Sequence, residues 1–128
     1  MIAVRPVAWD DGADALFGRI AATCPMPGGF YRDEVLARGS RLVEVVSDGE
    51  RVGAFIVRTE PEDAVIVAAA GAAPGVDLVR AVLPVVEREA FAAGFQGVRF
   101  HTGRAGLIRK AEAMGWRRQE TVMRKDRG

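Results

Sequence analysis

The sequence of 128 residues contains only one cysteine, Cys24, and one histidine, His101. An internal disulfide is therefore excluded, and so is a zinc site built from four cysteine or histidine ligands. No apolar run approaches the roughly 20 residues that cross a bilayer. The first residues also lack the basic and apolar regions of a secretory signal. These absences favour a protein of a reducing compartment, the cytoplasm, without a membrane span.

Three common catalytic motifs are missing as well: a P-loop, a GxSxG nucleophile elbow and an HExxH metal motif. Hydrophobic residues make up 49% of the chain and charged residues 27%, which is typical of a folded globular protein. A chain of this length is too short to form two well-buried cores. A single domain over residues 1–128 is therefore expected, with no metal among its cofactors.

Charge is distributed unevenly around a net value of +1. Residues 1–98 carry 9 basic and 14 acidic side chains, whereas residues 99–128 carry 9 basic and 3 acidic ones. The basic segment 99–128 suits an anionic partner, which includes nucleic acid, a phosphorylated cofactor or an acidic protein surface. It is equally consistent with a solvated basic face, because the sequence lacks the pattern of a nucleic-acid-binding module.

Hydrophobic spacing and turn residues predict an alternation of strands and helices. Pro6 is expected to stop the first strand, and Asp48-Gly49 to form a hairpin turn. Asp77 is expected to cap a long helix that Pro84 kinks and whose inward apolar stripe extends to Phe91. The predicted strands cover residues 1–5, 41–47, 51–59, 64–70, 97–102 and 117–125, and the predicted helices cover 11–24, 30–38, 78–93 and 105–114.

The resulting order of elements is β-α-α-β-β-β-α-β-α-β. The three middle strands are expected to form an antiparallel meander, and the two late β-α units add further strands to the same sheet. The uninterrupted apolar run 64–70 predicts a central strand that is buried on both faces. The fold class is therefore α+β (α/β mixed sheet), with a central mixed sheet flanked by helices.

The loop from Gly71 to Asp77 joins this apolar strand to the long helix. N–H groups at a helix N-terminus attract phosphate, and glycine lets an anion approach the main chain closely. Asp77 adds a negative charge at the same place, and no Lys or Arg between Arg58 and Arg80 offsets it. Both a phosphate site and an ordinary capped turn fit the sequence.

Two side chains are candidates for accepting a proton. His101 lies near the end of a predicted strand, where sheet proteins often place reactive groups, and imidazole can act as a base near neutral pH. Glu60 lies in the turn before the apolar strand, where it can take a proton from a substrate amine if the turn faces a pocket. The alternatives are a half-exposed strand histidine and a solvated turn carboxylate.

The order of elements and several segments resemble the GNAT superfamily of acetyl-CoA-dependent N-acetyltransferases over nearly the whole chain. In that family the penultimate helix commonly closes with an aliphatic residue, glycine and an aromatic residue, and Met114-Gly115-Trp116 fits this pattern. Val4-Arg5-Pro6 resembles the family's first strand. The segment Val98–Lys125 is similar to small acetyltransferase-like proteins of phages and prophages.

This resemblance implies that acetyl-CoA lies between the strands 64–70 and 98–102. An amine would attack the thioester while Glu60 or His101 accepts its proton, directly or through water. The residues that the resemblance implies as contacts of the CoA phosphates are Ala73, Pro74, Gly75, Val76, Arg104 and Arg109.

The chain departs from the family pattern at two places. The family's phosphate loop reads Arg or Gln, two residues, Gly, one residue, then Gly or Ala. Laid on this sequence, it begins at Ala72, keeps Gly75 and ends at Asp77, whose charge opposes a phosphate. The family's frequent general acid is a tyrosine four residues before the helix-ending glycine, and that position is Ala111. The resemblance therefore implies a retained scaffold with weak or lost catalysis.

Two functions are compatible with these observations. The first is N-acetyl transfer from acetyl-CoA by a degenerate enzyme of phage or prophage type. The second is a non-catalytic interaction protein, a virion or assembly component, that uses the same scaffold. Its basic segment 99–128 would then bind protein, nucleic acid or further copies of the chain, in the cytoplasm or in the virion.

Overall fold

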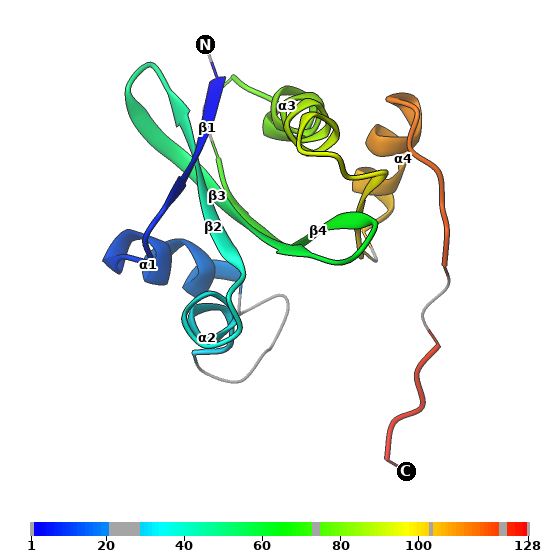
Figure 1. The fold of residues 1–128 in the computed structure, drawn as a ribbon, viewed down its shortest axis with the longest axis horizontal. Helices are drawn as coiled ribbons and strands as arrows, with labels where there is room; N and C mark the ends of the chain where they lie inside the picture. The colour runs from blue at the N-terminus through cyan, green and yellow to red at the C-terminus, as the bar shows by residue number, and fades with distance from the viewer. Residues whose placement is uncertain (1, 21–28, 73–74, 103, 121–122, 128) are drawn as a thin grey trace.

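The computed structural model describes residues 2–20, 29–72, 75–102, 104–120 and 123–127. This part of the chain forms one five-stranded sheet in the order β1-β2-β3-β4-β5. Helices α1 and α2 lie on one face of the sheet, and α3 and α4 lie on the other (Figure 1). The elements are β1 (Ile2–Val7), α1 (Asp11–Ile20), α2 (Phe30–Leu36), β2 (Arg41–Ser47), β3 (Glu50–Thr59), β4 (Asp63–Gly71), α3 (Leu78–Ala92), β5 (Gly97–Phe100) and α4 (Ala105–Ala113).

The sheet is mixed, as the sequence predicts. Strands β1 to β4 pair antiparallel, and β5 pairs parallel with β4. The β2–β3 turn is tight because Asp48 and Gly49 both have positive φ, 50° and 82°. Positive φ at both central residues matches the right-handed twist of a hairpin. The predicted α+β class and the antiparallel meander are therefore confirmed.

Two hydrophobic clusters hold the helices against the sheet. On the α1 side, Phe17 is 2% exposed and stacks near Trp9 and Tyr31, with ring centroids 5.7 and 5.5 Å away. On the α3 side, Val86 packs against strands β2 and β3. The buried members of the two clusters are Ala13, Phe17, Leu42, Ala54 and Ile56, and Val45, Phe55 and Val86.

The first strand continues past Pro6, contrary to the prediction that it stops there. Pro6 lies opposite Val43 in the β1–β2 ladder, and β1 ends at Val7. Strand β1 is at the edge of the described sheet, so about half of its N–H groups point away from any neighbour. A proline, which has no N–H, fits such a position without breaking the ladder.

Helix α3 begins where Asp77 caps it: the carboxylate Oδ1 accepts the N–H of Arg80 at 3.4 Å. The helix runs through Pro84 to Ala92. Phe91 was expected to face inward, but it is 51% exposed, whereas Ala90 is 8% exposed. Successive helical residues are about 100° apart, so Phe91 turns out of the face that Ala90 buries.

Strand β4 is less buried than its apolar sequence predicts. Ala64 and Val65 are buried at 4% and 2% exposure, but Ala69 and Gly71 are exposed. The reason is that β5 pairs with only the first half of β4, from Asp63 to Ile66. The prediction of burial along both faces of the whole run is wrong for its second half.

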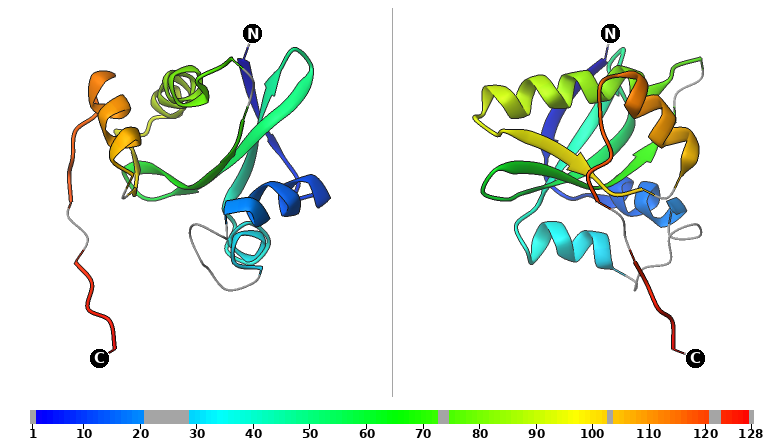
Figure 2. Two further views of the ribbon diagram at one scale, coloured as in Figure 1. Left: turned by 180° about the vertical axis from the view of Figure 1, so that it is seen from behind. Right: turned by 90° about the vertical axis from the view of Figure 1, so that its right-hand side faces the viewer.

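The predicted last strand, residues 117–125, is also not formed by those of its residues that the structure describes, and residues 121–122 lie outside them. Residues 117–120 and 123–127 carry no helix or strand and leave the body after α4 (Figures 1 and 2). A strand is stable only when a neighbouring strand pairs with it. No described strand pairs with these residues, so their β-like pattern alone is insufficient.

Candidate functional site

Strands β4 and β5 separate part-way along the sheet. They pair from Asp63 opposite Gly97 to Ile66 opposite Phe100, and no further pairing follows in the described chain. At this point β4 contains one extra residue, Val67, because Ile66 lies opposite Val57 while Ala68 lies opposite Ile56. Such a bulge bends a strand. We call the gap beyond it, between residues 67–71 and the chain after β5, the fork.

The β4 side of the fork is lined by small residues with free backbone groups. Residues 67–71 read Val-Ala-Ala-Ala-Gly, and Ala69 is exposed. Among the described strands, only β3 pairs with this stretch, so the edge of β4 that faces the fork offers N–H and C=O groups. An extended ligand that carries amides can pair with such an edge.

The end of β4 leads directly into the N-terminus of α3. Gly71 has φ of 145° and lies so close to β3 that an added Cβ would be 2.5 Å from the Gly53 Cα. Farther along the loop, Gly75 has φ of 70°, and no atom lies within 4 Å of a Cβ added there. The next residue, Val76, is 40% exposed. Gly75 is therefore open on its Cβ side ahead of the helix, whereas Val76 forms an isolated β-bridge. The predicted contacts Ala73 and Pro74 lie outside the described residues.

Two cations balance the charge of Asp77: Arg80 from the first turn of α3 and Lys110 from the distant helix α4. Oδ2 of Asp77 lies 3.1 Å from Nζ of Lys110 on α4 and 3.4 Å from Nε of Arg80. The hydrogen bond from Lys110 is the main reason why the pKa of Asp77 lies below its ordinary value. The fold therefore corrects the expectation that the carboxylate is unbalanced, although it still occupies the position that an anion would take.

Two predicted phosphate contacts lie at the start of and within the neighbouring helix α4, which packs beside α3 (Figure 2). Arg104 immediately precedes α4, where its N–H donates to Thr102 Oγ1 at 3.1 Å. Arg109 is one position before Lys110. Both arginine side chains are exposed, and in the described part of the chain neither forms an ion pair.

His101 lies at the fork. It follows Phe100, the last residue of β5 that pairs with β4, and it is exposed. The predicted strand 97–102 ends before this histidine, so the imidazole belongs to the loop between β5 and α4. It is therefore the candidate base that lies where the two strands open.

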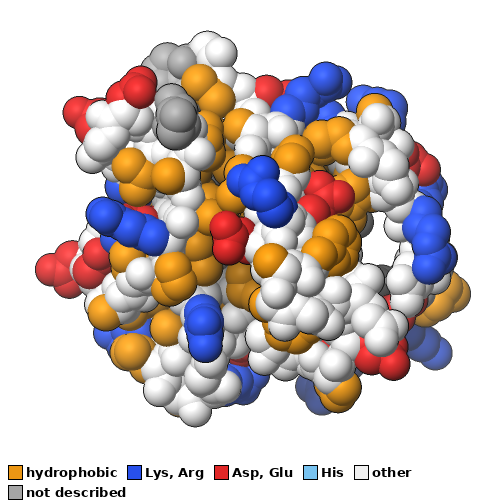
Figure 3. All heavy atoms as spheres, turned by 45° about the horizontal axis from the view of Figure 1, so that its top comes forward, with side chains coloured by type: hydrophobic (Ala, Val, Ile, Leu, Met, Phe, Trp, Pro, Cys, Tyr) orange, Lys and Arg blue, Asp and Glu red, His pale blue; other side chains and the backbone are white. Residues whose placement is uncertain are grey.

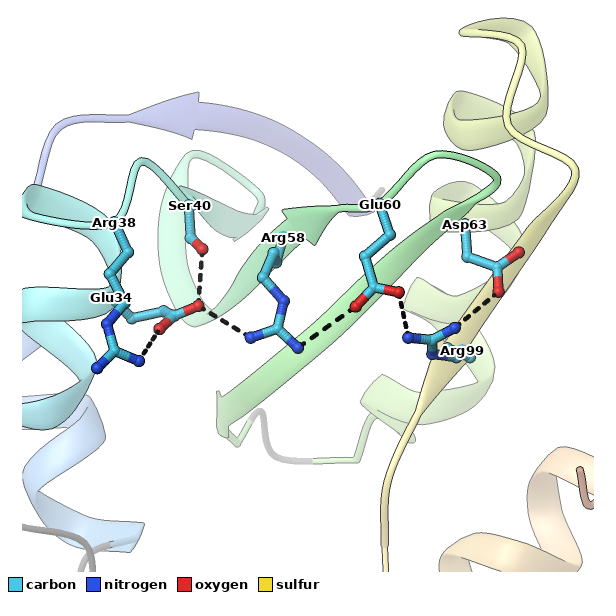
Figure 4. Close-up of polar contacts among 7 residues, drawn as sticks. All are labelled: Glu34, Arg38, Ser40, Arg58, Glu60, Asp63 and Arg99. Atoms are coloured by element: carbon cyan, nitrogen blue, oxygen red, sulfur yellow. Dashed lines mark hydrogen bonds and ion pairs between the residues drawn. The ribbon is translucent and has the colours of Figure 1, made fainter. Parts of the chain in front are cut away.

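Glu60 lies at the opposite end of β4 from the loop 71–77. One of its carboxylate oxygens pairs closely with Arg99 of β5, and the other lies 3.7 Å from Arg58 (Figure 4). Arg99 also donates to Asp63 at 3.1 Å. The carboxylate of Glu60 holds the pKa of Arg99 above its ordinary value. Proton transfer at Glu60 must therefore first break an ion pair.

These contacts belong to a longer row of charges that ends in the interior. Glu34 of α2 is 1% exposed, and it accepts a hydrogen bond from Ser40 at 3.0 Å. Arg38 and Arg58 each lie 3.4 Å from its carboxylate (Figure 4). Because breaking one partner of a buried pair is costly, this row fixes α2, the β3–β4 turn and β5 relative to one another.

The end of α4 follows the sequence prediction. Gly115 has φ of 92°, and the N–H of Trp116 donates to the Ala111 carbonyl at 3.0 Å, which closes the helix. Trp116 packs on Phe100 with ring centroids 5.1 Å apart. Ala111, the position of the family's tyrosine acid, is 5% exposed and carries no hydroxyl.

Comparison with known proteins gives a likeness of fold. No family model matches the chain, and no curated protein matches its sequence. The ribosomal-protein-alanine N-acetyltransferase from Brucella melitensis biovar Abortus 2308 superposes with a TM-score of 0.75, at 15% identity over 100% of both chains. A GNAT family acetyltransferase from Elizabethkingia anophelis, with acetyl-CoA bound, gives 0.72 at 18% identity, covering 93% of this chain and 78% of the other.

The chain has the GNAT acetyltransferase fold. An acetyltransferase from Trypanosoma brucei shares it with a TM-score of 0.70, at 18% identity over 98% and 99% of the two chains. The described residues contain no helix long and apolar enough to cross a membrane. They also contain no group of three or more His, Cys, Asp or Glu side chains placed to hold a metal ion.

Sequence reasoning missed three residues that shape this site. Val67 forms the bulge, Lys110 neutralises Asp77, and Arg99 engages Glu60. An apolar run gives no local signal for a bulge. The two cation contacts join residues 33 and 39 positions apart in the chain, so only the folded structure brings them together.

Proposed function

We propose that this protein binds acetyl-CoA in the fork and transfers the acetyl group to an amine. The observation that carries the proposal is the separation of β4 and β5 at Val67, next to an open loop at the N-terminus of α3. An extended ligand with amides and a diphosphate at one end matches both features. No other part of the described chain combines a free strand edge with exposed main chain ahead of a long helix.

The residues present fit the cofactor in three respects. The residues after Val67 up to Gly71 are alanine and glycine, whose small side chains would obstruct a ligand little at the free edge of β4. The main chain at Gly75, which has open space on its Cβ side, can donate to phosphate, supported by the dipole of the 15-residue helix α3, and the exposed Val76 lies beside it in an isolated β-bridge. Arg104 and Arg109 supply positive charge from α4. Ala73 and Pro74 remain part of the proposal on sequence grounds alone.

Bound acetyl-CoA supplies an activated acetyl group, whose thioester carbon an amine attacks with the CoA thiol as leaving group. His101 accepts the proton that the amine loses, because it is exposed at the fork and imidazole is suited to this near neutral pH. Glu60 can accept a proton only after its ion pairs with Arg99 and Arg58 break. We therefore assign Glu60 first to positioning these two arginines, and His101 to accepting the proton.

Turnover is expected to be weak. Asp77 places a carboxylate where the diphosphate would lie, and its two cations must be shared with the ligand. Ala111 offers no hydroxyl to protonate the departing thiolate. With Asp77 and Ala111 at these two positions, the chain keeps the scaffold that binds acetyl-CoA but transfers the acetyl group slowly.

The test is CoA binding by thermal shift and acetyl-CoA hydrolysis or transfer to a panel of amines. At a CoA concentration about ten times its Kd, a rise in Tm of about 5 °C is expected. Ala69→Glu should abolish the shift, because it adds a carboxylate at an exposed position of the fork. The matched control is Ala92→Glu at the far, exposed end of α3, about 20 Å from its first turn.

The control should bind CoA as the natural chain does. Absence of a thermal shift at millimolar CoA in the natural chain would contradict the proposal. An equal loss of binding in both variants would show that net charge, and not the fork, controls affinity.

A second candidate is the non-catalytic interaction protein, of virion or assembly type. The extended, basic residues 117–120 and 123–127 favour it, because they take no part in the fork. CoA binding without measurable transfer to any amine, together with a defined protein or nucleic-acid complex, would support this candidate over the enzyme.

A further inference from the structure

The loop ahead of α3 offers few free donors to a diphosphate. The N–H of Ala72 already donates to the Val52 carbonyl at 3.0 Å, and that of Arg80 donates to Oδ1 of Asp77 at 3.4 Å. Pro74 has no N–H to give, because proline lacks one. A helix N-terminus binds phosphate through several N–H groups that have no other acceptor. This end of the fork therefore has a weak hold on the diphosphate of CoA.

The cations at this end are also engaged within the protein. Oδ2 of Asp77 lies 3.1 Å from Nζ of Lys110 and 3.4 Å from Nε of Arg80, so both have a partner before any ligand arrives. Arg104 and Arg109 form no ion pair in the described part of the chain, but they are exposed, and water weakens ion pairs at such positions. On the face drawn in Figure 3, Lys and Arg side chains are interspersed with Asp and Glu and form no single basic patch. The phosphates of a nucleotide therefore gain little from charge here.

The strand end of the fork suits an uncharged ligand with amides. Strand β4 pairs with β5 only as far as Ile66, so residues 67–71 keep a free edge within the described chain. Alternate residues of a strand direct their N–H and C=O groups to the same side, which here is the fork. The pantetheine arm of CoA carries amides and no charge, so it can pair with this edge without help from a cation. The arm therefore has partners in the fork that the nucleotide lacks.

We propose that the fork recognises its acetyl donor by the pantetheine arm, and that it accepts acetyl thioesters of pantetheine that lack the nucleotide. This inference rests on the proposed function, since it concerns the donor of the same transfer. The chemistry is unchanged: the amine nitrogen bonds to the acetyl carbon, the C–S bond breaks, and the proton that the amine loses to His101 ends on the pantetheine thiol. The nucleotide of CoA should then raise affinity by no more than about tenfold.

The test compares the affinities of separate parts of CoA for the full chain by titration calorimetry. The ligands are CoA, pantetheine, and adenosine 3′,5′-bisphosphate, which is the nucleotide part of CoA. We expect a Kd for pantetheine within about tenfold of that for CoA, and a Kd for the bisphosphate at least about a hundredfold higher than that for CoA. Added salt should leave the binding of pantetheine unchanged, because this ligand carries no charge.

Asp77→Asn shows whether the carboxylate is what weakens the hold on the nucleotide. Removing its charge should strengthen the binding of CoA and leave that of pantetheine unchanged, so the ratio of the two affinities should rise about fivefold. Asp10→Asn is the matched control, because Asp10 caps α1 outside the fork, and its ratio should equal that of the natural chain. The Tm of each variant without ligand checks that it folds. A ratio in Asp77→Asn equal to that of the natural chain would overturn the inference.

Two sources share this donor chemistry: a free pantetheine thioester, and a carrier protein whose phosphopantetheine group holds the acetyl thioester. Titrations with free acetyl-pantetheine and with an acetylated carrier protein distinguish them. Tighter binding of the carrier protein would assign the donor to the protein-bound form, and equal or weaker binding would assign it to the free form. Either result supports recognition by the pantetheine arm.

The titrations of the natural chain separate this inference from the proposed function. Binding of CoA, with pantetheine weaker by more than about tenfold, would overturn the inference and leave the proposed function in place. Binding of the bisphosphate as tight as that of CoA would do the same. If neither CoA nor pantetheine binds, the proposed function is wrong, and the inference is wrong with it.

Discussion

The charge of Asp77 can be removed without removing its cap on α3. In Asp77→Asn, an amide oxygen can still accept the N–H of Arg80, which the carboxylate accepts at 3.4 Å. In the natural chain Nζ of Lys110 lies 3.1 Å from the Asp77 carboxylate. The substitution removes this ion pair, so Lys110 can interact with an incoming anion. If the diphosphate of CoA binds at this helix N-terminus, the variant should bind CoA more tightly than the natural chain.

The size of the effect follows from the exposure of the site. The Asp77 side chain is 34% exposed, so a charge at this place acts through a largely aqueous medium. Removing one unit charge a few ångströms from a phosphate under these conditions should strengthen binding about fivefold. Salt screens such interactions, so the gain should shrink between 0.05 and 0.5 M salt, as expected for Debye lengths of about 14 and 4 Å.

Titration calorimetry with CoA at the two salt concentrations provides the assay. Asp10→Asn is the matched control, because Asp10 caps α1 through the N–H of Ala13 at 2.8 Å and lies outside the fork. It changes net charge by the same amount. Lys110→Met should have the opposite effect to Asp77→Asn and weaken binding.

Three results would refute this reasoning. Equal gains in Asp77→Asn and Asp10→Asn would mean that only overall charge matters. An unchanged or weaker affinity in Asp77→Asn would mean that the diphosphate binds elsewhere. A gain that does not depend on salt would exclude an electrostatic origin.

Further predictions concern the scaffold. The pKa of Glu44 is lowered by hydrogen bonds from Arg5 and then Arg51, and Glu44 is 4% exposed. Glu44→Gln should therefore lower the free energy of unfolding by about 2 kcal/mol at pH 7, as measured by urea unfolding. The natural chain should keep this advantage above the ordinary pKa of 4.5 and lose it as pH falls through the lower folded value. Gly71→Ala should destabilise by more than about 2 kcal/mol, since its Cβ would lie 2.5 Å from the Val52 carbonyl oxygen. Gly75→Ala, also at positive φ but in open space, should lower the free energy of unfolding by only about 1 kcal/mol. Equal destabilisation of the two variants in thermal unfolding would contradict this prediction.

Local patterns in the sequence were sufficient for the elements and their order up to α4. The Asp48-Gly49 turn, the Asp77 cap and the Gly115 stop each depend on the residue's own backbone preference or side-chain acceptor. Such signals act within a few positions, so they can be recognised without a fold. The order of elements also predicted the mixed sheet, and this order together with the segment Met114-Gly115-Trp116 carried the resemblance to the GNAT family.

Local patterns failed where the outcome depends on a distant neighbour. The apolar run 64–70 reads as one buried strand, yet β5 is too short to cover its second half. Residues 117–125 read as a strand, yet no described strand pairs with them. Pro6 reads as a stop, yet an edge position tolerates it.

The sequence by itself determined the order of the helices and strands from β1 to α4 and turns such as Asp48-Gly49, because those choices follow from spacing and backbone preference. Only the tertiary structure decided the fork at Val67, the neutralisation of Asp77 by Lys110 and the ion pairs of Glu60. Strand pairing and ion pairing between distant segments are set by how the whole chain packs, and residue spacing does not encode them locally.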